Sequence, residues 1–229
     1  MTINCKLSKK ILIVFFYRCR NFYVNIMKKI ASFSIFIFIV QSFCFSQIKI
    51  KSLDEINGLN VGDSIENFQA INQYGDTFDL YQSLKEGPLV LIFYRGRWCP
   101  VCNRYLSNLQ DSIKFIYQKG AKVVAISPEK PGLLSKTQQK TGAEFILLHD
   151  EGYKIAAMFD VLFKPSNSTL FLYNTFAGAD LKDAHGQDEQ LLPVPATFII
   201  GKNKKILWRH FDRNYKIRAG VWEILQNIP

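Results

Sequence analysis

The chain has 229 residues and a formal net charge of +10, a balance that by itself would point to an acidic partner such as nucleic acid. Seven of the 29 Lys and Arg residues lie in residues 1–46, which contain no Asp or Glu, so the rest of the chain holds 22 basic against 19 acidic side chains. Because the basic character belongs to the N-terminal segment, we expect no nucleic-acid partner.

Residues 1–46 have the pattern of a leader that contains a secretory signal peptide. A basic stretch at 27–29 begins with the methionine that we expect to be the translation start, and residues 30–40 are almost entirely apolar. Small residues then occupy the −3 and −1 positions of a cut after Ser46. The apolar run is shorter than the roughly 20 residues of a membrane span. We predict cleavage after Ser46 and export, to a bacterial periplasm, with at most a transient membrane association through the leader. The apolar residues 11–17 keep an uncleaved anchor open as the alternative.

The remaining residues, 47–229, are expected to form a single domain. Three of the five cysteines lie in the leader, so this domain retains only Cys99 and Cys102. One pair is too few for a disulfide-stapled scaffold, and the domain is long enough to bury an ordinary hydrophobic core.

The first half of the domain alternates predicted strands and helices. Residues 68–80 predict a small hairpin, with Gly75 and Asp76 in its turn. The continuous apolar run 89–94 is typical of a central strand buried on both faces. Pro100 suits the first turn of a helix whose apolar positions recur at helical spacing and which Gly120 can end.

The same alternation continues to the C-terminus. The elements that we expect there are a strand at 121–127, a helix at 133–140, a strand at 145–148, a helix at 153–159, a hairpin at 196–210 and a closing amphipathic helix around 217–225. A polar insertion, residues 164–192, interrupts them and contains the aromatic residues Phe171, Tyr173 and Phe176. This insertion either shapes a substrate pocket or forms a small core of its own. The pattern predicts an α/β fold with a central sheet flanked by helices.

The sequence Trp98-Cys99-Pro100-Val101-Cys102 follows the predicted central strand and starts the next helix. At a helix N-terminus, unpaired N–H groups and the helix dipole stabilise a thiolate. Such sites lower the cysteine pKa from ~8.5 to roughly 3.5–7.5. We therefore expect a redox-active pair. The neighbours expected around it are the positive side chains of Arg95, Arg97 and Arg104 and an apolar rim from Tyr94 and Trp98.

A zinc site is not expected at this pair. Zinc requires four ligands and the two cysteines supply two. The three histidines, His149, His185 and His210, are scattered without ligand spacing. No metal and no other cofactor is expected.

The stretch FYRGRWCPVCNRYL (93–106), together with VPATF (194–198), resembles the thioredoxin superfamily. More narrowly, it resembles the peroxiredoxin-like branch of the alkyl hydroperoxide reductase/thiol-specific antioxidant family. The resemblance runs from about Val61 to Ile228 and includes the segments 61–84 and 125–161. It implies a thioredoxin-like fold with a mixed sheet, an N-terminal hairpin and an insertion before the strand that starts at Pro195. It also implies a cis bond before Pro195, beside the active site.

The chain departs from the family's Pro-x-x-x-Thr-x-x-Cys motif. With Cys102 at the cysteine position, Cys99 replaces the threonine and Arg95 replaces the proline. The family motif thus assigns the attack on peroxide to Cys102, whereas the thioredoxin WCxxC pattern assigns it to Cys99. Helix geometry favours Cys99, because the earlier residue is less deeply placed in the helix.

The resemblance implies a thiol-dependent peroxidase that reduces hydrogen peroxide or organic hydroperoxides and is regenerated by a thioredoxin-like donor. Two alternatives stay open: an exported protein-disulfide reductase, and a non-catalytic binding module on the same fold. The residues expected to act are Cys99, Cys102 and Arg97 in catalysis, with Trp98, Tyr94, Pro195 and Arg218 binding substrate, and Arg213 as a further candidate for steadying the peroxide.

Overall fold

The computed structural model describes residues 50–229. The predicted signal peptide, its cleavage after Ser46 and its membrane association lie outside these residues. The elements in chain order are η1 (Leu53–Glu55), β1 (Gln69–Ile71), β2 (Thr77–Asp79), α2 (Leu80–Glu86), β3 (Leu89–Phe93), α3 (Pro100–Asp111), α4 (Ile113–Gln118), β4 (Lys122–Ser127), α5 (Pro131–Thr141), β5 (Ile146–His149), η2 (Glu151–Tyr153), α6 (Lys154–Met158), β6 (Leu162–Phe163), α7 (Asn167–Thr175), α8 (Leu181–His185), β7 (Leu192–Pro193), β8 (Ala196–Ile200), β9 (Ile206–Phe211) and α9 (Val221–Asn227).

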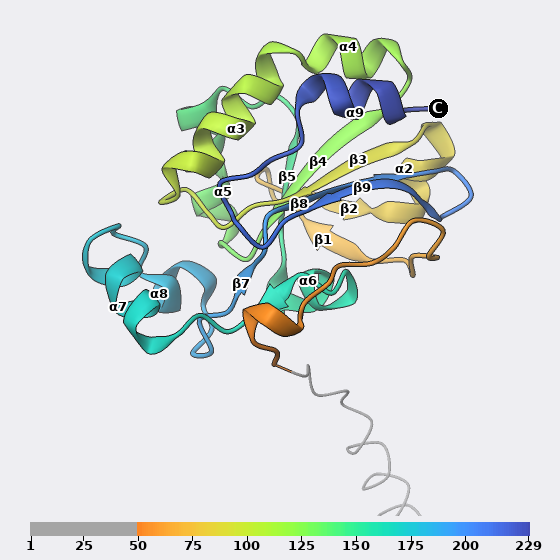
Figure 1. Cartoon of the computed structure of the whole chain (residues 1–229). Coiled ribbons are helices and arrows are strands. Elements are labelled where there is room, and N and C mark those ends of the chain that lie inside the picture. The colour runs from red at the N-terminus through yellow and green to blue at the C-terminus, as the bar shows by residue number, and fades with distance from the viewer. Residues whose placement is uncertain (1–49) are drawn as a thin grey trace, which may run out of the picture. The chain divides into compact units, whose positions relative to one another are not determined.

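A five-stranded mixed sheet forms the centre of the fold, in the order β5-β4-β3-β8-β9 (Figure 1). β3, β4 and β5 run parallel, whereas β8 and β9 are antiparallel additions on the other side of β3. All five residues of β3 are buried, which explains why this strand is apolar without alternation. The predicted α/β class with a mixed sheet is confirmed.

Helices cover both faces of the sheet and create two hydrophobic cores. The first core contains apolar residues of α3, α4, α5 and α9, such as Leu106, Ile116 and Ile224. Figure 1 shows α3, α4 and α9 together on this side. The second core lies under α2 and α6 and contains Leu84 and Phe159. No helix within residues 50–229 is long and apolar enough to span a membrane.

The helix that follows β3 is shorter than predicted. Its register buries Cys102, Leu106 and Leu109 on one face, as the apolar spacing indicated. The helix ends at Ser112, where the backbone leaves helical geometry, and α4 starts directly afterwards. Gly120 then adopts a φ of 73°, the left-handed conformation that favours glycine after a helix. The single helix predicted up to Gly120 is therefore two helices, with a break at Ser112 and with Gly120 after the end of α4.

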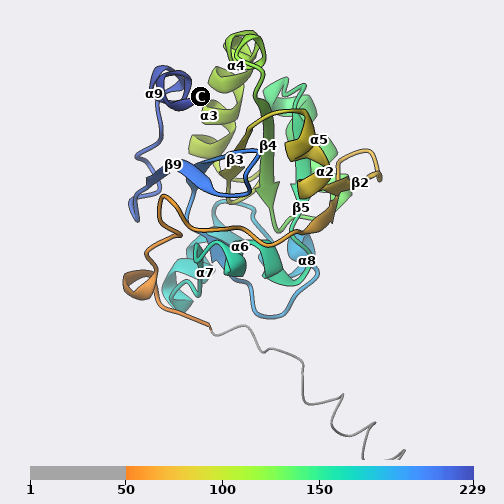
Figure 2. The same ribbon diagram turned by 90° about the vertical axis from the view of Figure 1, so that its right-hand side faces the viewer.

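The insertion between α6 and β8 forms two short helices, α7 and α8, which Figure 2 shows at the end of the domain away from α4 and α9. The side chain of Asn174 joins its parts: Oδ1 accepts from the Leu181 N–H at 2.9 Å, and Nδ2 donates to Gln190 at 2.8 Å. The N–H of Lys130, just before α5, donates to the Ala184 carbonyl at 2.9 Å and ties the insertion to the rest of the domain.

The prediction of a cis bond before Pro195 is wrong, because residues 50–229 contain no cis peptide bond. Val194 donates its N–H to the Val161 carbonyl at 2.7 Å, and the chain passes directly from there into β8. A trans bond serves this extended entry, and trans is the preferred isomer of an X-Pro bond. Pro195 nevertheless lies where β8 begins, at the sheet end from which β3 leaves toward the cysteines.

Replacing Phe198 by Ala should destabilise the domain strongly. Phe198 is fully buried, and its ring centroid lies 5.1 Å from that of Phe159 and 6.2 Å from that of Phe93. Loss of this ring should lower the free energy of unfolding by about 3–5 kcal/mol in urea titrations. Phe176→Ala removes a ring that is 76% exposed and should change it by less than about 0.5 kcal/mol. Equal effects of the two substitutions would contradict the assigned core.

Candidate functional site

The two cysteines lie at the start of α3, directly after the loop that leaves β3. Cys99 is the N-cap residue of α3, and its Sγ accepts the backbone N–H of Cys102 at 3.4 Å. The two sulfurs are 2.6 Å apart, and both residues are free thiols. Cys99 has no exposed surface and Cys102 is 1% exposed. The pair is placed to form a disulfide with little movement of the backbone.

Arg95 is the positive group in contact with Cys99. Its Nη2 donates to Cys99 Sγ at 3.2 Å, and its Nη1 donates to the Tyr173 hydroxyl at 2.8 Å. The guanidinium carbon lies 3.7 Å from the ring centroid of Tyr215 and 5.0 Å from that of Trp98. Arg95 is only 4% exposed, and within residues 50–229 no ion pair joins it to a carboxylate. The sulfur of Cys99 is thus the group that can balance this buried charge.

These contacts separate the pKa values of the two thiols. The hydrogen bond from the Cys102 thiol, with the charge and hydrogen bond of Arg95, lowers the pKa of Cys99 to about 5, against the opposing effect of burial. Burial raises the pKa of Cys102 well above its usual range, and its hydrogen bond to Cys99 acts in the same direction. At neutral pH the pair therefore consists of a Cys99 thiolate and a Cys102 thiol, the arrangement that a nucleophile with a neighbouring resolving thiol requires.

Glu129, in the loop after β4, holds the segment that carries Cys99. Its Oε2 accepts the backbone N–H of Arg97 at 2.8 Å, and the residue is only 1% exposed. Burial raises the pKa of this carboxyl to about 7. Gly96 makes the approach possible: its φ is 144°, and a Cβ there would lie 2.7 Å from both Glu129 Oε1 and Trp98 Nε1. A larger residue at Gly96 would displace this brace.

Two of the arginines singled out in the sequence lie apart from the sulfurs. Arg97 contributes its backbone N–H to Glu129, and within residues 50–229 its side chain makes no hydrogen bond to either cysteine. Arg213 donates to the backbone carbonyls of Ile56 and Asp54, which fastens the N-terminal segment of the domain. Arg218 does reach the site, because its Nη2 lies 3.6 Å from Cys102 Sγ.

The predicted aromatic neighbours differ in their positions. Trp98 is 8% exposed and packs against Tyr173 of the insertion, with ring centroids 4.8 Å apart. Tyr94 is 1% exposed and belongs to the core beneath the site. The three aromatic residues of the insertion do not form one core: Phe171 and Phe176 contact each other on the surface, while Tyr173 contacts Arg95.

Four residues at the site were not assigned their positions from the sequence: Arg95 as the contact to Cys99, Glu129, Tyr173 and Tyr215. The sequence places Arg95 among three positive charges near the cysteines but does not indicate which of them contacts Cys99. A carboxylate in the apolar surroundings of a predicted strand end could have drawn attention to Glu129. No local signal connects Tyr173 or Tyr215 to a cysteine more than 70 positions earlier in the chain.

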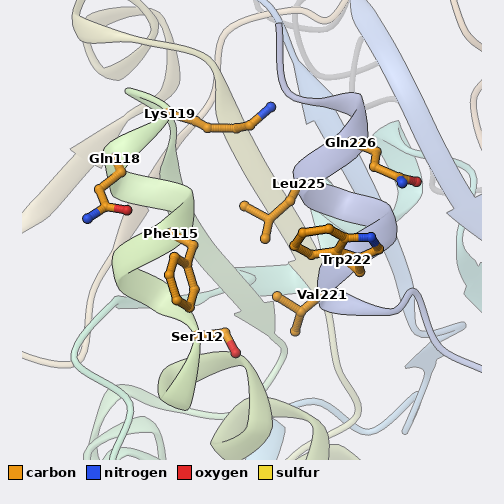
Figure 3. Close-up of a pocket in the computed structure, with 8 residues that line it drawn as sticks. All are labelled: Ser112, Phe115, Gln118, Lys119, Val221, Trp222, Leu225 and Gln226. Atoms are coloured by element: carbon orange, nitrogen blue, oxygen red, sulfur yellow. The ribbon is translucent and has the colours of Figure 1, made fainter.

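The pocket in Figure 3 lies elsewhere, between α4 and α9. Its volume is about 630 Å³, and the side chains that line it include Phe115, Val221, Trp222 and Leu225. It also contains Ser112, at the far end of α3 and about 18 Å along the helix from the cysteines at a rise of 1.5 Å per residue. Within the described residues, no three His, Cys, Asp or Glu side chains gather in a way that could hold a metal ion.

Replacing Arg95 by Met should raise the pKa of Cys99. The substitution keeps an unbranched side chain and removes the guanidinium, whose positive charge favours the thiolate. The pKa of Cys99 should rise from about 5 toward the usual value near ~8.5, and its rate of alkylation by iodoacetamide at pH 6 should fall by about tenfold or more. Peptide mass spectrometry at Cys99 over a range of pH measures this. The matched control is Arg104→Met, at an exposed position on α3. An unchanged profile in Arg95→Met would contradict the assigned contact.

Glu129→Gln should change how stability depends on pH. The carboxyl has a folded-state pKa near 7, above its unfolded value of 4.5. Between these values the folded wild type binds more protons than the unfolded chain, so this carboxyl's contribution to stability is present below pH 4.5 and is lost as the pH rises through 7. Gln does not titrate but can still accept the Arg97 N–H. Between pH 4 and pH 8, the free energy of unfolding of the variant should rise relative to that of wild type by on the order of 3 kcal/mol. Urea unfolding of both reduced proteins measures this difference, and a parallel pH dependence would disprove the buried, titrating carboxyl.

Comparison with known proteins places this geometry in a family. The sequence model of the AhpC/TSA family matches residues 61–209. Among similar proteins is the peroxiredoxin Bcp of Escherichia coli strain K12, 30% identical over 141 residues, which are 59% of this chain and 86% of that protein. The peroxiredoxin Bcp of Bacillus subtilis strain 168 is 26% identical over 172 residues, which are 74% of this chain and 95% of the relative.

Solved structures support the fold. The peroxidoxin BcpB of Mycobacterium tuberculosis superposes with a TM-score of 0.54 and 24% identity, over 67% of this chain and 86% of that one. A mutant of Xylella fastidiosa PrxQ gives a TM-score of 0.58 and 18% identity, over 74% of this chain and 95% of that one. The predicted thioredoxin-like fold is thereby confirmed. Since the family model covers more than half of the chain, the protein belongs to the AhpC/TSA family.

Proposed function

We propose that the protein is a thiol-dependent peroxidase in which Cys99 attacks the peroxide and Cys102 resolves the product. The observation that carries this proposal is the buried Arg95 guanidinium 3.2 Å from Cys99 Sγ, next to a second thiol whose pKa is raised. Membership of the AhpC/TSA family and the peroxiredoxin names of its relatives support a peroxidase.

The reaction uses both sulfurs. The Cys99 thiolate attacks one peroxide oxygen, the O–O bond breaks, and the departing oxygen takes up a proton to leave as water or an alcohol. Cys99 is then a sulfenic acid. The Cys102 sulfur attacks the Cys99 sulfur, the S–O bond breaks, and the hydroxide leaves as water with the Cys102 proton. Two electrons have passed from the dithiol to the peroxide, and a Cys99–Cys102 disulfide remains.

Assigning the attack to Cys99 departs from the family motif, in which Cys102 holds the cysteine position. Three observations support Cys99. Arg95 donates to it, its pKa is lowered to about 5, and it caps α3, whereas burial keeps Cys102 protonated. Arg95 itself stands in place of the motif's proline, so the substitutions at both positions act together: one supplies the nucleophile and the other its positive partner.

The remaining parts of the proposal concern the donor and the location. Residues 47–229 contain no cysteine besides Cys99 and Cys102, so the reductant of their disulfide must come from outside these residues. Thiol–disulfide exchange with a thioredoxin-like dithiol would return the pair to the reduced state. The basic, apolar and small-residue order of residues 27–46 supports export to a periplasm.

A protein-disulfide reductase is the second candidate. The WCPVC sequence and the N-cap position of Cys99 favour it, since a low-pKa first cysteine and a buried second cysteine also suit exchange with a protein disulfide. The complete burial of Cys99 weighs against a large disulfide substrate.

Rapid mixing of the reduced protein with hydrogen peroxide tests the function. We expect fast oxidation in wild type and in Cys102→Ser, and no oxidation above background in Cys99→Ser. The Cys99→Ser variant thereby also measures any oxidation of cysteines in the leader. Cys102→Ser should accumulate a sulfenic acid at Cys99 that dimedone traps and peptide mass spectrometry locates. Trapping at Cys102 in Cys99→Ser would reverse the assignment. Wild-type oxidation no faster than that of a free thiol, together with reduction of insulin disulfides, would favour the second candidate.

A further inference from the structure

A residue of the insertion contacts the arginine that donates to the Cys99 sulfur. Cys99 has no exposed surface, and Tyr173 of α7 lies over the group that contacts it. The Tyr173 hydroxyl accepts from Arg95 Nη1 at 2.8 Å, and its ring packs against Trp98 at 4.8 Å between centroids. These contacts hold one ring of the insertion against two residues of the loop that carries the nucleophile.

We propose that Tyr173 determines the size of the peroxide, so that the site takes hydrogen peroxide in preference to bulky organic hydroperoxides. This inference rests on the proposed peroxidase function and names its substrate class. The Tyr173 ring limits access to Cys99. A small oxidant reaches the sulfur with the ring in place, whereas a large alkyl group must displace the ring.

The polarity of the surroundings also favours a small polar oxidant. Arg95 Nε and Trp98 Nε1 are buried donors that have no hydrogen-bond partner within the described residues. Hydrogen peroxide carries acceptor and donor oxygens at both ends and can satisfy such groups. The alkyl group of an organic hydroperoxide would instead lie against a buried guanidinium, which disfavours it because the cation would lose polar partners.

The neighbours of Tyr173 on α7 point away from the site. Phe171 is 62% exposed and Leu172 is 53% exposed. Tyr173 is partly buried by its contacts with Arg95 and Trp98. α7 is held by Asn174 through its bonds to Leu181 and Gln190, so the ring is presented by a fixed element. Tyr173 is therefore the residue of α7 that contacts Arg95 and Trp98, and Phe171 offers a matched control on the same helix.

The test compares oxidation rates with hydrogen peroxide and with cumene hydroperoxide in wild type, Tyr173→Ala, Tyr173→Phe and Phe171→Ala. Wild type should prefer hydrogen peroxide. In Tyr173→Ala this preference should fall by about tenfold or more, mainly because cumene hydroperoxide reacts faster. Tyr173→Phe keeps the ring and should retain the preference, although both rates can fall with the loss of the hydroxyl. Phe171→Ala should match wild type. A preference in Tyr173→Ala within about twofold of wild type would overturn the proposal, since one removed ring should change discrimination far more.

A second readout separates this inference from the proposed function. Alkylation of Cys99 by iodoacetamide and by a bulky maleimide, followed by peptide mass spectrometry, measures the opening above the sulfur without any peroxide. Tyr173→Ala should speed the maleimide selectively. If wild type fails to react rapidly with hydrogen peroxide but Tyr173→Ala speeds the maleimide selectively, the peroxidase proposal fails, whereas the limit that Tyr173 sets on access to Cys99 is supported. If hydrogen peroxide reacts rapidly, and Tyr173→Ala changes neither the preference between the two peroxides nor that between the two alkylating reagents, the peroxidase proposal is supported and the size limit by Tyr173 is excluded. Thermal unfolding of each variant confirms that the comparison is made on folded protein.

Discussion

The contact between the Arg95 guanidinium and the Cys99 sulfur is the interaction on which the site depends. A buried guanidinium usually has a carboxylate partner, because removing a charge from water is costly. Here, none of the ion pairs within residues 50–229 involves Arg95, and its charge is met by one sulfur, one hydroxyl and the faces of aromatic rings. Thiolate and guanidinium stabilise each other, so the ionisation of Cys99 and the burial of Arg95 are a single property of the site.

Several distant parts of the chain must meet for this contact to form. β3 ends at Phe93, two residues before Arg95, and Cys99 caps α3, so the sheet and the helix fix the two partners. Glu129, after β4, accepts the backbone N–H between them. The insertion adds Tyr173, and the segment before α9 adds Tyr215 on the guanidinium. The parallel strands β3 and β4 end at the same edge of the sheet, where loops at the carboxyl ends of strands commonly carry function.

The local part of this arrangement could be predicted from the sequence, and the rest could not. A buried apolar run followed by CxxC and a proline indicates a thiolate at a helix N-terminus, because strand, cap and helix lie within a few residues of each other. Which arginine contacts Cys99 depends on the direction that each long side chain takes, and the sequence does not show this. Arg97 was preferred by position, but its backbone is held by Glu129 and Arg95 makes the contact. The cis bond predicted before Pro195 rested on the family pattern, whereas the chain enters β8 through a trans bond. The role of Tyr173 depends on tertiary structure, since α7 is about 70 residues from the cysteines along the chain.

The two thiols are best treated as one charge shared between two sulfurs. The Cys102 thiol donates to Cys99, which stabilises the thiolate there and at the same time holds the proton on Cys102. The same hydrogen bond therefore prepares the nucleophile and protects the resolving thiol from premature oxidation. Once Cys99 has lost its negative charge by oxidation, its contribution to keeping Cys102 protonated is removed, while burial, the larger contribution, still opposes the ionisation of Cys102. The order of the two chemical steps follows from this coupling, because Cys102 becomes a better nucleophile only after Cys99 has reacted.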